Sequence, residues 1–346
     1  MEWPMLSWLS QTMERAFMFN PLKYLKNRRV GLALGSGGAK GLAHLAVIEV
    51  LESMEIPIHM IAGSSIGAVV GALHCCGSLA RFKSDILKLT LREILSYIDP
   101  VVPRSGLLDG KGAVKFLERY IPRTAMIEKL KIPLAVIATD YDNGMPVIIR
   151  SGSVLEALRA SISIPGVMVP VRYRETLLVD GGVANPLPIN IVKGMGAGIT
   201  IAVNLHPRIK KRGLRHYVKS QMPARGEDAD SSEIEVVSEG GQAPLPSPGS
   251  GGGWVRALER WLRPREKSVR QGLPNIFEVI TQSVDIMEYV NTALILKYNR
   301  PTVLIEPNVT DVGTLGFTEA ERILQEGYLA CERSRKSLIR RVRRWV

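Results

Sequence analysis

The chain has 346 residues, a formal net charge of +12 at pH 7 and a hydrophobic content of 46%. This length and apolar content suffice for one sizeable core, so we expect one α/β domain with appendages. There is no run of about 18 apolar residues and no signal-peptide pattern, and the three cysteines show neither a disulfide framework nor metal-ligand spacing. We therefore predict a cytoplasmic protein without a membrane-spanning helix, a metal or a cofactor.

The positive charge is concentrated in the last third of the chain. It lies in segments that begin at Pro207 and Trp254 and in the C-terminal sequence RSRKSLIRRVRRWV. Such charge indicates an anionic partner, either nucleic acid or a phospholipid surface. The core lacks aromatic residues interleaved with Lys and Arg, and only 6% of all residues are aromatic, which argues against nucleic acid. We therefore expect an anionic membrane surface, and no nucleic acid, as the partner.

The first elements in chain order are two strand–turn–helix units. Residues 28–36 read as a buried strand that runs into the turn GSGGAKG, and a helical pattern covers 40–54. A second strand at 58–62 leads into the turn GSSIG and a helix at 66–76. Further elements are predicted at 133–140, 145–150, 176–182 and 198–205 as strands, and at 153–161 as a helix. This alternation predicts a three-layer α/β sandwich with a mainly parallel central sheet.

The strand–helix pattern breaks after Leu205. Residues 221–253 are rich in Pro, Gly, Ser and acidic residues, and we predict them to be disordered. In 254–270 an apolar helical face opposes an arginine-rich face, as in an interfacial helix. That apolar face consists of Trp254, Leu258, Trp261 and Leu262. The last predicted elements, a helical C-terminal part with one strand, are a long amphipathic helix at 275–298, a strand at 301–307 and a helix at 318–342.

The second turn presents a candidate nucleophile. Ser65 has glycines two positions away on both sides, Gly63 and Gly67, whereas Ser64 does not. The pattern G-x-S-x-G between a strand and a helix is typical of a nucleophile elbow, a strained turn that exposes the serine hydroxyl. The helix that follows directs its positive end at that oxygen. We therefore predict Ser65 as the nucleophile.

The first turn has the geometry of an anion site. It fits neither the dinucleotide nor the Walker pattern, because Lys40 occupies the position of the third glycine and no Gly-Lys-Ser/Thr follows. A glycine-rich turn between a strand and a helix start leaves backbone N–H groups free to bind an oxyanion or phosphate. The alternative is a tight turn that only packs the helix against the sheet.

A serine needs a base to become a nucleophile at neutral pH. Asp180 ends the apolar strand TLLVD and is followed by two glycines. Because the C-terminal ends of parallel strands share one edge of a sheet, Asp180 and Ser65 can meet there. A simple turn aspartate is the alternative. The order Ser65, Asp180, His206 also fits the triad of an α/β-hydrolase, since His206 follows the strand GITIAVNL.

The sequence contains the motifs G-S-G-G-A-K-G, G-S-S-I-G and D-G-G in this order. With these motifs it resembles bacterial members of the patatin-like phospholipase family, over roughly residues 28–205 and 273–330. The resemblance implies a serine lipid acyl hydrolase of the phospholipase A, lysophospholipase or esterase type. It would use a Ser–Asp dyad without a catalytic histidine. The implied site consists of Ser65 as nucleophile, Asp180 as base, the N–H groups around Gly37 and Gly38 as oxyanion hole, and Lys40 in a positioning role.

The expected organisation has four parts. They are an N-terminal amphipathic segment (1–27), a patatin-like catalytic domain (28–205), a basic, disordered insertion with an amphipathic helix (206–270), and C-terminal helices and a strand with a basic tail (271–346). The expected substrate is a phospholipid or another acyl-ester lipid, met by a peripheral protein at the inner face of the membrane. The expected acyl pocket is lined by Ile164, Val167, Met168 and Val169.

Two alternatives remain at this point. One is a triad enzyme that uses His206, and the other is a non-catalytic module that binds acidic lipid. The sequence determines neither the physiological lipid nor the oligomeric state.

Overall fold

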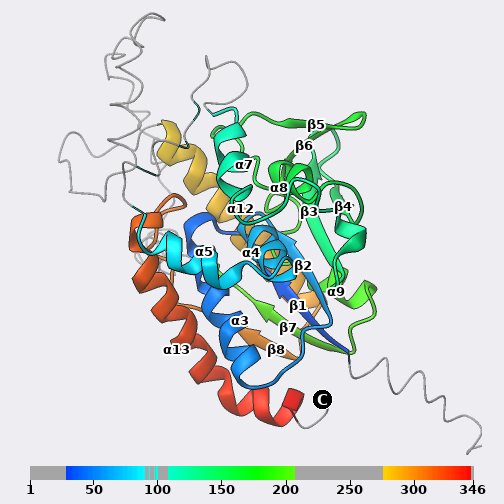
Figure 1. The fold of residues 1–346 in the computed structure, drawn as a ribbon, viewed down its shortest axis with the longest axis vertical. Helices are drawn as coiled ribbons and strands as arrows, with labels where there is room; N and C mark the ends of the chain where they lie inside the picture. The colour runs from blue at the N-terminus through cyan, green and yellow to red at the C-terminus, as the bar shows by residue number, and fades with distance from the viewer. Residues whose placement is uncertain are drawn as a thin grey trace, which may run out of the picture.

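The computed structural model describes residues 29–89, 93, 97, 99, 108–206 and 276–343. The described residues form one sheet of eight strands in the order β5-β6-β3-β2-β1-β7-β8, with β4 also paired to β3. Figure 1 shows this sheet at the centre of the fold. The strands are β1 (Val30–Leu34), β2 (Met60–Ser64), β3 (Leu134–Asp140), β4 (Pro146–Ile149), β5 (Val171–Tyr173), β6 (Thr176–Asp180), β7 (Ile199–Val203) and β8 (Val303–Ile305). The pairs among β3, β2, β1, β7 and β8 are parallel, and β4, β5 and β6 join through antiparallel pairs. The mainly parallel sheet is therefore confirmed.

Helices cover both faces of the sheet. The longer ones are α3 (Ala43–Ser53), α4 (Ile66–Cys75), α5 (Leu79–Ile86), α7 (Lys111–Leu117), α8 (Val154–Ser161), α9 (Ile189–Gly194), α12 (Ile276–Tyr298) and α13 (Ala320–Leu338). Short helical turns are η1 (Gly38–Leu42), η2 (Ile127–Lys129), η3 (Phe317–Glu319) and η4 (Ile339–Arg343). The predicted α/β fold class, with its helical C-terminal part, is confirmed. The sequence patterns did not identify α5, α7, α9 and β5.

Two apolar clusters make this a three-layer structure. Along β1, Val30, Leu32 and Leu34 belong to the cluster beneath α3, α4, α8 and α13, whereas Ala33 belongs to the cluster beneath α9. Ile295 of α12 packs against the second cluster. This alternation follows from the period of two along a strand, and burial of both faces explains why the strands read as continuous apolar runs.

The C-terminal part completes the core. β8 pairs in parallel with β7, and α13 packs along α3, beside which it lies in Figure 1. A Cβ at Gly327 would lie 2.6 Å from the carbonyl oxygen of Ala43, so glycine allows the two helices to approach closely. None of the described helices is long and apolar enough to cross a membrane. The predicted segment 1–27, the insertion 221–253 and the helix at 254–270 lie outside the described residues.

Candidate active site

Ser65 lies in the tight turn between β2 and α4. Its φ of 53° and ψ of −122° are values that residues with a side chain rarely adopt, as expected of a strained elbow. A Cβ at Gly63 would lie 2.4 Å from the amide nitrogen of Ala68, and one at Gly67 would lie 2.3 Å from the carbonyl oxygen of Leu34. Both flanking positions therefore require glycine for the turn to close.

Asp180 lies directly against this serine. The Ser65 hydroxyl donates a hydrogen bond to Asp180 Oδ2 at 2.6 Å, and the Gly182 N–H donates to Asp180 Oδ1 at 2.7 Å. The Thr139 hydroxyl donates to the backbone carbonyl of Asp180 at 2.8 Å. Ser65 and Asp180 are only 4% and 3% exposed. The carboxylate is thus oriented on both oxygens and shielded from bulk water.

The two residues meet by a different route from the expected one. The strand β6 runs antiparallel to β3, so Asp180 does not lie at a C-terminal edge shared by parallel strands. Instead, Asp180 pairs with Ala138, whose neighbour Ile137 pairs with Ser64 on β2. The register across β2, β3 and β6 therefore aligns the carboxylate with the elbow.

The surroundings of Asp180 favour its protonated form. Burial, and after it the negative charge of Glu288, raise the pKa of the Asp180 carboxyl to about 8, against the lowering effect of the hydrogen bonds from Ser65 and Gly182. A carboxylate of ordinary pKa is a weak base at neutral pH, whereas a pKa near the working pH suits proton transfer. The site therefore holds a stronger base than an exposed aspartate.

The glycine-rich turn borders the same pocket. Gly37 and Gly38 have φ values of 144° and 56°, and both line the pocket with Ser65 and Asp180. Within the described part of the chain their N–H groups meet no acceptor, whereas the N–H of Ala39 donates to Thr314 O at 2.8 Å. Two free N–H groups beside a serine hydroxyl are the donors that an oxyanion hole needs.

Helix α12 forms a wall of the pocket that sequence reasoning missed. Its Thr281, Val284, Asp285 and Glu288 line the pocket, which holds only about 10 Å³ of free volume. From Val279 onward the acidic residues of this helix are Asp285 and Glu288, which lie three positions apart on one face. The spacing of these two carboxylates was the signal available in the sequence, but the sequence around them does not show which turn they face.

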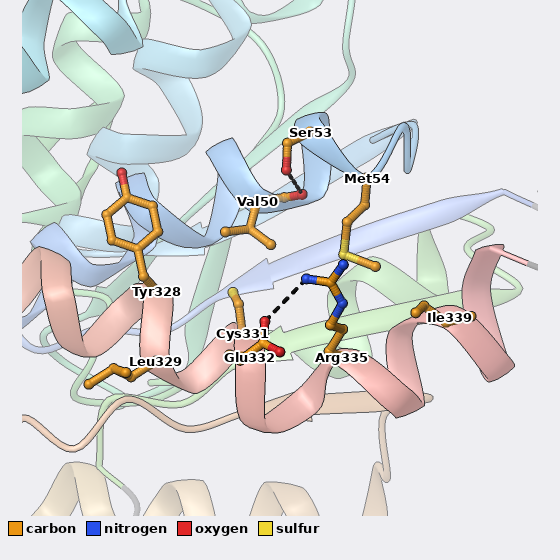
Figure 2. A pocket seen from close by; sticks show the side chains of 9 residues that line it. All are labelled: Val50, Ser53, Met54, Tyr328, Leu329, Cys331, Glu332, Arg335 and Ile339. Carbon is orange, nitrogen blue, oxygen red and sulfur yellow. Dashed lines mark hydrogen bonds and ion pairs between the residues drawn. The ribbon is translucent and has the colours of Figure 1, made fainter.

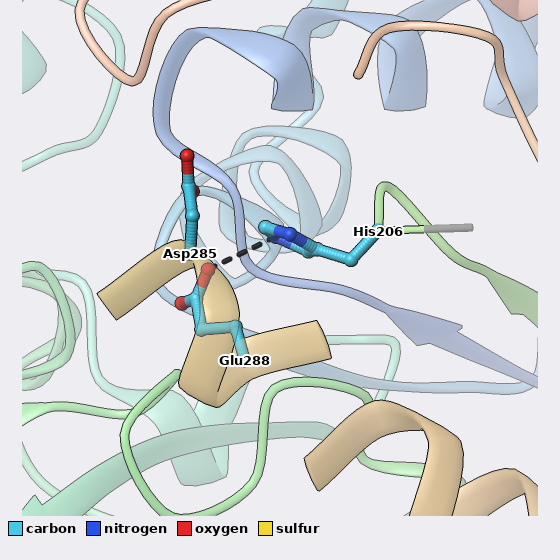
Figure 3. A group of neighbouring side chains, drawn as sticks. All are labelled: His206, Asp285 and Glu288. Carbon is cyan, nitrogen blue, oxygen red and sulfur yellow. Dashed lines mark ion pairs between the residues drawn. The ribbon is translucent and has the colours of Figure 1, made fainter. Parts of the chain in front are cut away.

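Two ion pairs join α12 to the sheet edge. Nζ of the buried Lys40 lies 3.0 Å from Asp285 Oδ1. Nε2 of His206 lies 2.9 Å from Glu288 Oε2, and Figure 3 shows this second pair. Burial would raise the pKa of the Glu288 carboxyl, but His206, Ser36 and Lys40 lower it overall. Glu288 is therefore an anion held close to Ser65 and Asp180.

The same side chains offer possible metal ligands. One ligand atom from each of His206, Asp285 and Glu288 lies within 4.8 Å of the other two. However, Lys40 already contacts Asp285 and His206 already contacts Glu288. The donor set is thus engaged in internal ion pairs, and its geometry is that of a clamp on α12.

The expected acyl-chain residues are placed differently from one another. Ile164 lines the pocket beside Ser65, but Val167, Met168 and Val169 do not. Met168 instead forms a bridge with Leu108, and Val167 is 2% exposed. Of the four expected residues, Ile164 alone lines the described pocket.

A larger hollow of about 430 Å³ lies between α3 and α13, and Figure 2 shows the residues that line it. Its lining includes the hydroxyls of Ser53 and Tyr328, which donate hydrogen bonds to Val50 O and to Glu49, and the thiol of Cys331. Burial, and after it Glu332, raise the pKa of this thiol to about 12, and the thiolate is the reactive form. This thiol is therefore protonated near neutral pH, and it offers the hollow no reactive thiolate.

Comparisons with known proteins point to one family. The model of patatin-like phospholipases matches residues 32–193, which include both glycine turns and Asp180. An uncharacterized NTE family protein of Mycobacterium tuberculosis is 35% identical over 323 residues, covering 86% of this chain and 89% of that protein. The neuropathy target esterase of Drosophila melanogaster is 30% identical over 189 residues, covering 53% of this chain but 13% of the esterase.

Proposed function

Because the chain belongs to the patatin-like phospholipase family, we propose that it is a serine acyl hydrolase of lipids that uses Ser65 as nucleophile and Asp180 as base. Family membership supports a lipid hydrolase in general. The observation that carries the specific proposal is the 2.6 Å hydrogen bond from the Ser65 hydroxyl to Asp180 Oδ2 at a strained elbow.

The proposed reaction has two halves. In the first, the Asp180 carboxylate takes the hydroxyl proton while Ser65 Oγ attacks the ester carbonyl carbon. The N–H groups of Gly37 and Gly38 stabilise the oxyanion, and Asp180 returns the proton to the leaving alkoxide. In the second, Asp180 deprotonates a water that attacks the acyl-enzyme, and the proton returns to Ser65 as the carboxylic acid leaves. No histidine is needed.

The proposed substrate is a phospholipid, a lysophospholipid or another acyl-ester lipid at an anionic membrane surface. Support for the ester class comes from the relatives named as phospholipases and esterases. Support for the anionic surface comes from the net charge of +12. The pocket that α12 helps to line has only about 10 Å³ of free volume, which is too small for an acyl chain, so we expect its walls to move when a substrate binds.

The triad alternative has less support. A triad requires a histidine between the carboxylate and the serine. In the described residues, His206 Nε2 contacts Glu288 and the carbonyl oxygen of Ser36, whereas Asp180 contacts Ser65 directly. His206→Gln should therefore reduce turnover by less than about tenfold, whereas a triad histidine would cost about 10⁴-fold or more.

The test is release of p-nitrophenol from p-nitrophenyl butyrate. We expect Ser65→Ala and Asp180→Asn each to lower kcat by at least about 1000-fold, and the double variant to be no worse than either, because the two act as one unit. Ser64→Ala is the matched control, since the neighbouring hydroxyl has no partner among the described residues.

Each outcome discriminates between the readings. Substantial activity in Asp180→Asn would overturn the dyad. Equal activity in the wild type and Ser65→Ala would indicate a binding module whose esterase signal comes from elsewhere.

A further inference from the structure

Helix α12 exposes a row of apolar side chains on its outer side. Its inner face, towards the protein, carries the apolar Val284 and Ile295 together with five polar side chains: Thr281, Asp285, Glu288, Asn291 and Thr292. Its opposite face carries Val279, Ile286, Val290 and Leu294, each between 43% and 49% exposed. Their spacing of seven, four and four residues aligns them on one side of the helix. A surface helix of a globular protein normally points its apolar side inward.

The polar side is fixed in place, so the orientation of α12 is well determined. Asn291 Nδ2 donates to Val183 O at 2.8 Å, which adds to the ion pairs of Asp285 and Glu288. Rotating the helix to bury its apolar side would break all three contacts and expose two carboxylates that are now paired. The four exposed residues, which we call the α12 outer face, are therefore an apolar surface directly behind the wall of the catalytic pocket.

Charge around the α12 outer face selects its partner. In the described part of α12 from Val279 onward, both acidic residues are on the inner face, so no negative charge lies on the outer one. Exposed Lys297 and Arg300 follow at the C-terminal end, where Lys193 Nζ also donates to Arg300 O. Apolar side chains with cations at one end of the row fit the interface of a bilayer that contains anionic lipid.

We propose that the α12 outer face is the surface by which this protein lies on an anionic lipid bilayer. Val279, Ile286, Val290 and Leu294 enter the acyl boundary, and the cations at the helix end contact headgroups. The proposal rests on the proposed function only in that the bilayer would be the source of the acyl ester. The contact itself does not depend on catalysis.

The test measures binding of Ser65→Ala protein to vesicles of equal parts phosphatidylcholine and phosphatidylglycerol, so that hydrolysis does not interfere. Adding Val290→Asp and Leu294→Asp should weaken binding by at least about tenfold, because two apolar side chains leave the acyl boundary. The matched control is Leu87→Asp with Leu329→Asp, whose leucines are 44% and 45% exposed, directly after α5 and on α13. This control should bind like the parent.

A second readout separates this proposal from the proposed function. In protein that retains Ser65, Val290→Asp with Leu294→Asp should leave the rate on soluble p-nitrophenyl butyrate at the wild-type value. The rate of hydrolysis of vesicle lipid should fall in proportion to the loss of vesicle binding. If no ester is hydrolysed but the vesicle result holds, the proposed function fails and the docking surface stands.

Three outcomes would overturn the docking surface. The first is unchanged vesicle binding in the Val290→Asp, Leu294→Asp variant. The second is a large drop in its melting temperature, which would mean that other parts of the chain cover the α12 outer face. The third is a wild-type dimer that the substitutions dissociate on gel filtration, which would assign the face to a second copy.

Discussion

At the scale of single residues, the site depends on placing two carboxylates close together. Asp180 is buried against Ser65, and Glu288 of α12 lines the same pocket. His206 Nε2 lies 2.9 Å from Glu288 Oε2, whereas Asp180 accepts hydrogen bonds from Ser65 and Gly182 and has no cationic partner among the described residues. The environment thus pushes the two carboxyl pKa values apart: it lowers that of Glu288 and raises that of Asp180 to about 8. Such a separation is typical of catalytic pairs.

The pH dependence of turnover follows from this separation. A base acts only when ionised, so a raised pKa means that activity is lost as pH falls through it. We expect kcat/KM for a soluble ester to rise by about tenfold per pH unit at low pH and to level off near pH 8. Glu288→Gln removes a negative charge beside Asp180, favours its ionised form and should move the rise to lower pH.

The control for this prediction is Glu306→Gln. The Glu306 carboxylate accepts a hydrogen bond from Asn204 at the end of β7, away from the pocket residues. Its pH profile should match the wild type. A Glu288→Gln profile with an unchanged midpoint would show that Glu288 does not influence the base.

At the scale of elements, the glycine turn is held against a distant loop. A Cβ at Gly38 would lie 2.1 Å from Thr314 O, the same oxygen that accepts the Ala39 N–H. Its φ of 56° is a further obstacle to any side chain. The position of the two free N–H groups therefore depends on a residue almost 280 positions away in sequence.

Gly38→Ala should displace the turn and cost about 100-fold to 1000-fold in kcat, the range for loss of one oxyanion donor. Gly144→Ala is the matched control, because Gly144 has a φ of 70° and a Cβ added there would meet no atom within 4 Å. Both variants carry backbone strain, but only the first should lose activity on p-nitrophenyl butyrate. Similar losses in both would assign the effect to strain and not to the oxyanion site.

The sequence predicts an element well when neighbouring residues determine it, and poorly when contacts with distant segments do. The elbow at Ser65 follows from three residues in five, so its pattern is visible in the sequence. The direction of β6 is set by its pairing with β3, and a strand pattern contains no information on direction. The approach of Glu288 to Asp180 depends on how α12 crosses the sheet edge. Periodicity revealed that helix but not which side faces the core.

At the scale of the whole molecule, the family model covers fewer residues than the folded domain. The matched residues 32–193 end before β7, yet the core also includes β8 and α13. α13 buries a row of apolar side chains against the α3 side of the sheet: Ile323, Leu324, Ala330, Cys331 and Leu338. The sheet and its cover are complete only when residues after 300 return to it.

We therefore expect a chain of residues 1–206 to fail to fold, because it leaves β7 as an unpaired edge and the α3 face uncovered. Far-ultraviolet circular dichroism during heating should show no cooperative transition. The matched control removes residues 221–253, a stretch rich in Pro, Gly, Ser and acid that keeps α12, β8 and α13 attached. It should melt like the full chain and retain hydrolysis of p-nitrophenyl butyrate. A cooperative transition in 1–206 would show instead that residues 1–206 fold without the C-terminal elements.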